Sequence, residues 1–337
     1  MEIKKNYPLK EYNTFGINAF ASEFISVQTV AELVEVIEQN QGKKLFILGG
    51  GSNMLLTQDI DALVIHVNIK GIEVAGQDDD YVHVKAMAGE NWHGFVQYCI
   101  AHNYGGLENL SLIPGNVGTT PIQNIGAYGT EIKDTMVSCE ALEITTQQLK
   151  TFSNEECKFA YRESIFKGQL KGQYVITSVT FKLTKKDHKI NTSYGDIAAE
   201  LTAKGIIIPT LKDVGNAVTA IRQSKLPNPK ELGNSGSFFK NPIITIEQFE
   251  KLHLLYPQMP HYTLNDAEVK VPAGWLIEQC GFKGKRFGDA GVHARQALVI
   301  VNYGNATGQE LLDLSKNIQK TVLDTFGIEI EAEVNVI

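Results

Sequence analysis

The chain has 337 residues with 43% hydrophobic content, enough for two or three domains with sizeable cores, so a disordered chain is excluded. Its formal net charge is −7 and no run of lysine and arginine stands out, which disfavours nucleic acid or an anionic membrane surface as a partner. The segment 1–8 lacks a signal-peptide core, and no stretch is apolar for the roughly 20 residues of a membrane span, so we expect a cytoplasmic protein.

The N-terminal part predicts an α/β unit that ends in a glycine loop. A capping box at 29–32 opens an amphipathic helix, and an apolar strand follows at 45–48. Directly after it come Gly49, Gly50, Gly51, Ser52 and Asn53. Consecutive N–H groups at the end of a strand form a nest for phosphate oxygens, and the last two side chains add donors. The loop lacks the Rossmann and P-loop spacings, and 54–57 resembles another strand, so a flavin across two β-rich subdomains is favoured.

The remaining elements are predicted from hydrophobic periodicity. Strands are expected at 63–67, 81–87, 137–144, 174–183, 298–301 and the terminus. In 174–183, apolar and polar residues alternate between the two faces of the strand. Helices are expected at 91–103, 214–225, 246–255, 274–280 and, after a capping box at 307–310, at 311–326. Pro227 and Pro229 break secondary structure, and we place a domain boundary there.

The segment 114–129 is the most informative part of the chain. It contains four glycines, two prolines and several amide side chains in sixteen residues. Glycine loses the most backbone entropy on folding, so such a segment is costly to order without a ligand. Repeated glycines beside amide donors indicate main chain held against something polar and flat. Together with the 49–53 loop, this segment predicts a dinucleotide cradle made of loops.

Four further segments are candidates for chemistry, each with a plain structural alternative. The C-terminal run 328–336 alternates strictly, and its carboxylates line either a solvated edge or a cleft where one pKa is raised. Ser237 follows a Gly-Ser turn without the nucleophile-elbow register, so it either presents its hydroxyl to a pocket or simply follows a turn. Arg162 lies among aromatic residues, suited to a carboxylate ligand or to a salt bridge with Glu163 or another acid. Tyr194 lies in a polar stretch typical of a mobile or plain surface loop.

Two other sets of residues are less informative. Arg222 and Lys225 lie three apart near a helix C-terminus, where they complement the helix dipole. The four cysteines are scattered without metal-ligand spacing, so reduced packing cysteines are expected rather than a metal site or disulfides.

Taken together, these segments resemble the UDP-N-acetylenolpyruvoylglucosamine reductases, flavoenzymes of peptidoglycan precursor synthesis. The likeness spans 13–333 and is most specific at 113–129, 161–164, 225–227, 236–242 and 273–279. The insertion with Tyr194 is similar to the type I branch, whose tyrosine loop closes over the nucleotide sugar. The resemblance implies an α+β protein with an FAD-binding fold of the PCMH or vanillyl-alcohol-oxidase kind, made of two α/β subdomains plus a C-terminal α+β substrate domain.

The resemblance also implies domain boundaries and partners. FAD-binding subdomains are expected at 1–70 and 71–224, the second including a tyrosine loop near 187–212. The substrate domain is expected at 225–337, with its last strand returning to the active site. FAD is expected to be non-covalent and NADPH to be a co-substrate that reduces it, leaves, and is replaced by the sugar nucleotide. A monomer acting on small molecules is expected.

Site residues are carried over from the resemblance position by position. Catalysis falls on Ser237 as proton donor and on Arg162 and Glu333 as electrostatic residues. FAD is assigned to Gly49, Gly50, Gly51, Ser52, Asn53, Ile113, Gly115, Gly118, Thr119, Gln123, Asn124, Ala127, Tyr128, Ile176 and Arg222. The sugar nucleotide is assigned to Tyr194, Lys225, Asn241 and Gln279. Position 335 is Asn where some relatives carry arginine, so the resemblance carries over no cationic contact there.

The chemistry demands such residue types independently. Hydride addition to the β-carbon of an enol ether leaves charge on the α-carbon and its carboxylate, which a cation and a hydrogen-bond donor stabilise. Two alternatives stay open at this stage. One is another FAD oxidoreductase on the same scaffold, such as a hydroxy-acid or alcohol oxidase, which the lack of an obvious covalent flavin histidine disfavours. The other is a nucleotide-sugar-binding protein without redox activity, which would be colourless when purified.

Overall fold

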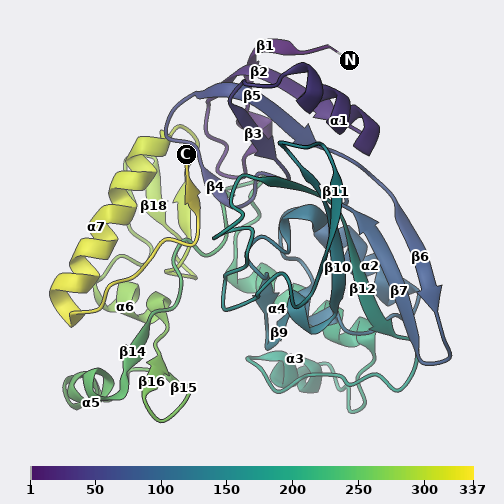
Figure 1. Ribbon diagram of the computed structural model, residues 1–337. Helices are drawn as coiled ribbons and strands as arrows, with labels where there is room; N and C mark the ends of the chain where they lie inside the picture. The colour runs from purple at the N-terminus through teal and green to yellow at the C-terminus, as the bar shows by residue number, and fades with distance from the viewer. Residues whose placement is uncertain (1) are drawn as a thin grey trace. The chain divides into compact units, whose positions relative to one another are not determined.

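The computed structural model describes residues 2–337, which form two compact units. Unit 1 comprises the residues up to Tyr7, Ala21–Gly50 and Asp61–Ser224, and unit 2 comprises Pro8–Phe20, Gly51–Ile60 and Lys225–Ile337. The chain therefore passes from one unit to the other more than once (Figure 1). Within the described residues, no helix combines the length and apolar character needed to cross a bilayer. The three domains expected from the sequence stay a prediction.

The first sheet of unit 1 carries the first glycine loop. Its strands run in the order β1 (Lys4–Pro8), β2 (Phe20–Val27), β5 (Ile60–Val67) and β3 (Leu45–Leu48), and β3 and β5 are parallel. Helix α1 (Val30–Gln39) begins at Thr29, whose hydroxyl accepts the Glu32 N–H at 3.1 Å. The apolar face of α1 packs on this sheet through Leu33, Val36 and Ile37. The predicted order of helix, strand and glycine loop is therefore confirmed.

The second sheet of unit 1 is larger and antiparallel throughout. Its strands run in the order β11 (Leu149–Ser153), β10 (Met136–Glu143), β12 (Tyr174–Thr184), β7 (Tyr81–Met87) and β6 (Ile72–Gln77). Helix α2 (Trp92–Ala101) packs on it, and the Phe95 and Phe181 rings lie 5.2 Å apart. The alternation predicted for β12 is confirmed from Val179 to Thr184 but not before it, because Val175 to Val179 are all buried. This central strand has packing on both of its faces.

Short elements lie between α2 and β10, in the connection that joins two strands of the second sheet. They are η2 (Glu108–Leu110), η3 (Val117–Thr119), β8 (Gly126–Ala127), β9 (Thr130–Glu131) and η4 (Ile132–Asp134). Helices α3 (Ile197–Ala203) and α4 (Leu211–Lys225) share a small apolar cluster. The sequence did not predict α3, which follows the tyrosine segment directly.

Unit 2 contains one four-stranded sheet, one three-stranded sheet and a two-stranded pair. Their orders are β13 (Gly233–Asn234), β19 (Ile300–Asn302), β18 (Ala290–Val292), β17 (Arg286–Phe287); β14 (Ile243–Thr245), β16 (Glu268–Lys270), β15 (Tyr262–Thr263); and β20 (Asn335–Val336), β4 (Met54–Leu55). Its helices are η1 (Lys10–Tyr12), α5 (Ile246–Leu255), α6 (Ala273–Gln279) and α7 (Gly308–Phe326).

Two predictions for unit 2 need correction. The terminal strand is much shorter than the alternating run 328–336, because regular pairing is confined to β20 against β4. The alternation is confirmed over 328–331, where the isoleucines are buried and the glutamates exposed, but it ends before the terminus, because Val336 is exposed. The strand predicted at 298–301 is displaced to Ile300–Asn302, where it pairs with β18.

Candidate active site

The two predicted glycine clusters meet inside unit 1. A Cβ atom added at Gly49 would lie 2.6 Å from Thr119 Cγ2, and one at Gly50 would lie 3.0 Å from the Gly115 Cα. A Cβ at Gly118 would lie 2.4 Å from the Cβ of Ala88. These approaches leave no room for side chains at the three glycines, so the two loops pack closely and their backbone N–H groups stay uncovered by side chains of these residues. Such a cradle of backbone N–H groups fits a pyrophosphate-containing cofactor such as FAD.

Four residues other than glycine have a left-handed backbone conformation near this cradle. The φ angles are +60° at Leu112, +46° at Asn124, +50° at Tyr128 and +57° at Arg162. Asparagine tolerates this region, but the other three carry a steric cost. Strained backbone of this kind persists only where contacts with neighbouring residues impose it, and it is found most often at functional sites.

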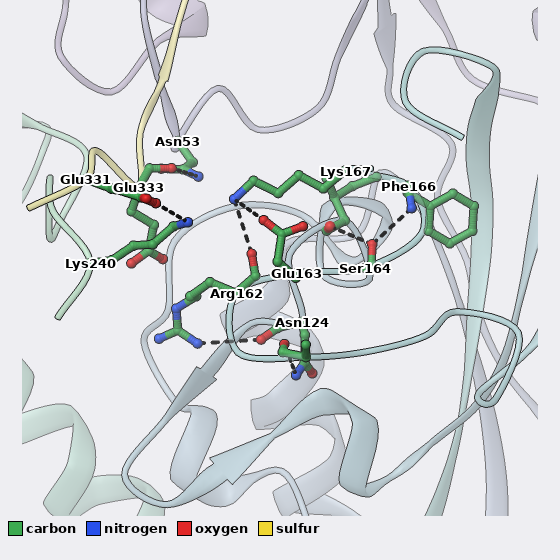
Figure 2. A network of polar contacts seen from close by, with 12 residues as sticks. Asn53, Asn124, Arg162, Glu163, Ser164, Phe166, Lys167, Lys240, Glu331 and Glu333 are labelled. Atoms are coloured by element: carbon green, nitrogen blue, oxygen red, sulfur yellow. Dashed lines mark hydrogen bonds and ion pairs between the residues drawn. The ribbon is translucent and has the colours of Figure 1, made fainter. Parts of the chain in front are cut away.

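The Arg162 guanidinium is oriented by carbonyl groups of the second glycine segment. Its Nη2 donates to the Gly126 carbonyl at 2.7 Å and its Nη1 to the Asn124 carbonyl at 3.5 Å. The guanidinium also lies 5.3 Å from the centre of the Tyr161 ring. Glu163, the expected alternative partner, forms an ion pair with Lys167 at 3.7 Å (Figure 2). The arginine side chain is thus fixed to the segment assigned to the cofactor.

Asn124 organises the same segment from inside. This fully buried side chain donates from Nδ2 to Glu131 Oε2 at 3.0 Å and to the Ala160 carbonyl at 3.1 Å. Its Oδ1 accepts the Lys133 N–H at 3.3 Å. With both amide hydrogens engaged, the Asn124 side chain joins the glycine segment to the loop that bears Arg162.

Arg222 reaches the cradle from α4. Its Nε donates to the Leu112 carbonyl at 3.2 Å. Burial lowers the pKa of Arg222, the Tyr128 hydroxyl opposes this and the nearby Arg162 lowers it further, although a guanidinium stays charged at neutral pH. The positive charges of two arginine side chains of unit 1 are therefore close enough to interact. Such an arrangement is suited to an anionic ligand.

The tyrosine loop is attached to the cofactor segment through Asn109. This buried side chain donates from Nδ2 to the Tyr128 carbonyl at 3.0 Å and to the Asn191 carbonyl at 2.9 Å. A Cβ at Gly129 would lie 3.3 Å from the Cβ of Tyr194, so the two segments are in contact. Tyr194 itself is 42% exposed. Sequence reasoning missed Asn109, because nothing in the pattern 107–110 marks it.

The other FAD candidates of unit 1 lie along the same segments. They are the half-buried Ile113, Gly115, Gly118, Gln123 and Ala127, the exposed Thr119, and Ile176, which is buried in β12. Gly51, Ser52 and Asn53 belong to unit 2, although they continue the first glycine loop. Gly51 has a φ of +61°, and a Cβ there would lie 1.9 Å from the Tyr12 carbonyl oxygen. Only glycine fits that position.

In unit 2, Ser237 follows a tight turn as predicted. Gly236 has a φ of +71°, and its N–H donates to Asn234 Oδ1 at 2.9 Å. The next residue, Phe238, is fully buried and donates its N–H to the Leu298 carbonyl at 2.8 Å. The turn and the anchored phenylalanine together fix the backbone on both sides of the partly exposed serine.

Glu333 is held beside the serine segment by backbone bonds. Its N–H donates to the Phe238 carbonyl at 2.8 Å, and its carbonyl accepts from Asn53 Nδ2 at 3.3 Å. Lys240 and Glu331 add an ion pair at 3.1 Å in the same pairing of segments (Figure 2). Asn335, the departure from the family pattern, donates from Nδ2 to the Asn53 carbonyl at 2.9 Å. Two of the three predicted catalytic residues are thus neighbours within unit 2.

The predicted substrate residues of unit 2 lie on or beside helices. Asn241 Oδ1 accepts the Ala273 N–H at 3.0 Å and so caps the start of α6, whereas the exposed Gln279 ends that helix. At ~1.5 Å rise per residue Ala273 and Gln279 are about 9 Å apart along the axis, so Asn241 lies near one end of α6 and Gln279 at the other. Lys225 is exposed at the end of α4.

Comparisons with known proteins agree with this geometry. Residues 21–150 match the FAD binding domain, and residues 228–337 match the C-terminal domain of UDP-N-acetylenolpyruvoylglucosamine reductase. The reductase of Flavobacterium johnsoniae is 68% identical over 337 residues, covering 100% of both chains. That of Chromobacterium violaceum is 48% identical, covering 99% of this chain and 98% of the relative.

Solved structures support the fold. The UDP-N-acetylenolpyruvylglucosamine reductase of Thermus caldophilus is similar with a TM-score of 0.69 at 24% identity, covering 99% of this chain and 98% of its own. A solvent-stable cholesterol oxidase is similar with a TM-score of 0.50 at 12% identity, covering 98% of this chain and 86% of its own. At these identities the likeness is one of architecture.

The two sheets of unit 1 and their glycine cradle define an α+β flavoprotein with the FAD-binding architecture of oxidases, as the sequence predicted. The full-length similarity at 68% identity goes further. The chain belongs to the UDP-N-acetylenolpyruvoylglucosamine reductase family, and it is an FAD-containing oxidoreductase of that family.

Proposed function

We propose that this protein uses NADPH to reduce the enolpyruvyl ether of UDP-N-acetylglucosamine to UDP-N-acetylmuramate. The observation that carries the proposal is the backbone pairing of the Ser237 and Glu333 segments in unit 2, in a chain of this family. It favours the reductase over a hydroxy-acid or alcohol oxidase and over a binding protein without redox activity. Bound FAD would accept hydride from NADPH and supply it to the β-carbon of the enolpyruvyl group.

The residues assigned to FAD act by holding it. The 49–53 and 113–128 loops would receive its pyrophosphate on backbone N–H groups, and Arg222 would add positive charge from α4. Asn124 keeps the second loop in its strained conformation through its three side-chain hydrogen bonds. Pre-organisation matters here, because each glycine would otherwise lose conformational entropy on binding.

Arg162 and Glu333 would stabilise the charge that develops on the substrate. Hydride addition at the β-carbon places negative charge on the α-carbon and the adjoining carboxylate. The Arg162 guanidinium, held by the Gly126 and Asn124 carbonyls, meets that charge without reorganising. Glu333 would form a hydrogen bond with the same carboxylate.

Ser237 would deliver the proton to the α-carbon. A serine hydroxyl is a weak acid, so it transfers a proton only to a strongly basic carbanionic centre and only at a fixed position. The turn at Gly236 and the buried Phe238 supply that fixed position. Tyr194, Lys225, Asn241 and Gln279 would bind the nucleotide sugar, with Tyr194 contributed by the tyrosine loop.

Half-reaction kinetics test this assignment. In anaerobic stopped-flow experiments, we expect Ser237→Ala to leave flavin reduction by NADPH nearly unchanged and to slow reoxidation by the enolpyruvyl sugar nucleotide by about 10²–10³ or more. Ser235→Ala is the matched control, since it removes a buried hydroxyl from the same turn two residues away. Equal slowing of both half-reactions in Ser237→Ala, or equal effects of the two variants, would contradict the role.

A further inference from the structure

Leu112 has a backbone conformation that its side chain disfavours. Its φ of +60° lies in the left-handed region, where a leucine Cβ crowds the following carbonyl oxygen. The residue directly precedes Ile113, Pro114 and Gly115, where the FAD-binding segment begins. Its conformation therefore sets the direction in which that segment leaves the core. Something outside the segment must impose it.

Side chains from two helices form hydrogen bonds with the backbone N–H and the carbonyl of Leu112. The Leu112 N–H donates to His93 Nδ1 at 2.9 Å, and the Leu112 carbonyl accepts from Arg222 Nε at 3.2 Å. His93 lies in the first turn of α2, which is capped by the Asn91 side chain, and Arg222 lies on α4. The strained residue is thus fixed by side chains from two rigid elements of unit 1.

The hydrogen bond to Leu112 defines the state of the imidazole. A backbone N–H always donates, so Nδ1 of His93 must be the unprotonated nitrogen and the ring must be neutral with its hydrogen on Nε2. Burial lowers the pKa of His93, and the positive charge of Arg222 lowers it further. Arg222 is the charged group acting on His93 from the helices packed here. Protonation would turn the acceptor into a second donor facing the Leu112 N–H.

Given the proposed assignment of Ile113 and Gly115 to FAD, we propose that His93 is a positioning residue for the cofactor, holding Leu112 in its left-handed conformation through a neutral imidazole. Neither the catalytic set nor the cofactor set assigned from the sequence contains His93. Because the hydrogen bond requires a neutral ring, FAD affinity should fall when the pH falls. The imidazole is neutral above the lowered pKa of His93 in the folded protein, so its contribution to FAD affinity is lost as the pH falls through that pKa.

The test measures FAD release and rebinding by the full-length protein between pH 5 and pH 8, followed by flavin fluorescence. At pH 8 we expect His93→Leu to bind FAD about tenfold more weakly, as the loss of one hydrogen bond and of the geometry it holds implies. The affinity of this variant should not fall with acidity as that of the wild type does. His93→Asn places an acceptor oxygen near the Nδ1 position and should restore most of the affinity at pH 8 while lacking the titration.

Two further variants sharpen the test. Leu112→Gly removes the steric cost of the left-handed conformation, so His93→Leu should have a smaller effect in that background. His102→Leu is the control, because His102 ends the same helix and its Nδ1 lies 2.8 Å from the Tyr98 carbonyl, within its own last turn. Its FAD affinity and pH profile should match those of the wild type.

Unchanged FAD affinity and an unchanged pH profile in both His93 variants would overturn the inference. If His93→Leu fails to fold, the pH profile of His93→Asn decides, since retention of the wild-type titration would count against His93. Hydrogen exchange at the Leu112 amide of the FAD-free protein gives a readout independent of activity, and it should be faster in His93→Leu. A wild-type protein that fails to bind FAD would contradict the proposed function, and the exchange measurement would still decide whether His93 holds the Leu112 backbone.

Discussion

At the scale of single residues, the site depends on side chains that bond to backbone. Arg162 bonds to two carbonyls, Asn124 joins three segments, and His93 and Arg222 hold the peptide groups of Leu112. Residue types and spacing pointed to Arg162 and the glycines. They did not point to His93 or Leu112, because a positive φ at leucine has no sequence signature and the partners are far apart along the chain.

Replacing Arg162 tests the importance of a planar, two-point contact. A lysine keeps the charge but loses the fork that bonds to both Gly126 and Asn124, so it should not hold one position. We expect Arg162→Lys to slow flavin reoxidation by the enolpyruvyl substrate by about 10²-fold, with a smaller effect on reduction by NADPH. Rapid-reaction absorbance measures both rates.

The control for Arg162 is its sequence neighbour. Glu163→Gln breaks the ion pair with Lys167, in which the Glu163 side chain is 45% exposed. Exposed pairs of this kind contribute about 0–1 kcal/mol, so both half-reactions should stay close to wild type. A reoxidation rate in Arg162→Lys that equals the wild-type rate would remove the electrostatic role.

At the scale of elements, the long helices and most central strands were predicted well because their periodicity reports burial directly, although strand β2 inside the first sheet was missed. Helix α5 was predicted at its observed bounds, and α2, α4 and α7 to within a few residues. The edge strands β6 and β11 were missed, since they are largely exposed and β6 is interrupted by a bulge near Gly76. The terminal strand was overextended, because alternating burial in 328–331 does not require a regular ladder.

The link between the tyrosine loop and the cofactor segment gives an element-scale prediction. Asn109→Ala removes the Nδ2 bonds to the Tyr128 and Asn191 carbonyls, so the base of the loop loses its attachment to the segment beside FAD. We expect the KM for the sugar nucleotide to rise roughly tenfold, as loss of about 1.4 kcal/mol of binding free energy implies, with little change in flavin reduction.

A second bridging asparagine provides the comparison. Asn154 donates from Nδ2 to the Lys133 and Met136 carbonyls, away from the tyrosine loop. Asn154→Ala should therefore lower the melting temperature to a similar extent without raising the KM. If both variants raise the KM equally, general destabilisation rather than loop attachment explains the effect. Steady-state kinetics and thermal unfolding monitored by circular dichroism supply the two measurements.

At the scale of the whole molecule, unit 2 is assembled from distant parts of the chain. Strand β20 pairs with β4, the Asn302 side chain donates to the Phe15 carbonyl at 2.9 Å, and the Asn234 N–H donates to the Thr14 carbonyl at 2.9 Å. The rings of Phe15 and Phe238 lie 6.2 Å apart in the same core. The sequence pattern gave no sign of this interleaving, since periodicity describes local structure only.

This interleaving predicts the behaviour of a fragment. Residues 225–337 expressed alone lack β4 and Phe15, which leaves β20 without its partner strand and the core beside Phe238 incomplete. We expect no cooperative thermal transition, because loss of one fully buried aromatic ring alone costs about 3–5 kcal/mol of a typical stability of about 5–15 kcal/mol. Circular dichroism during heating tests this, with the full chain as reference. A sharp transition in the fragment would show that unit 2 is self-sufficient.

The same interleaving has a consequence for folding during translation. Leu55, Leu56 and Phe15 are buried in the finished unit, yet they are translated well before the final hundred residues that cover them. At ~5–20 residues per second these apolar side chains wait for roughly 15–55 s. The nascent chain therefore exposes these apolar side chains to solvent before unit 2 can fold. Chaperone concentration and translation speed should then affect how much folded protein accumulates.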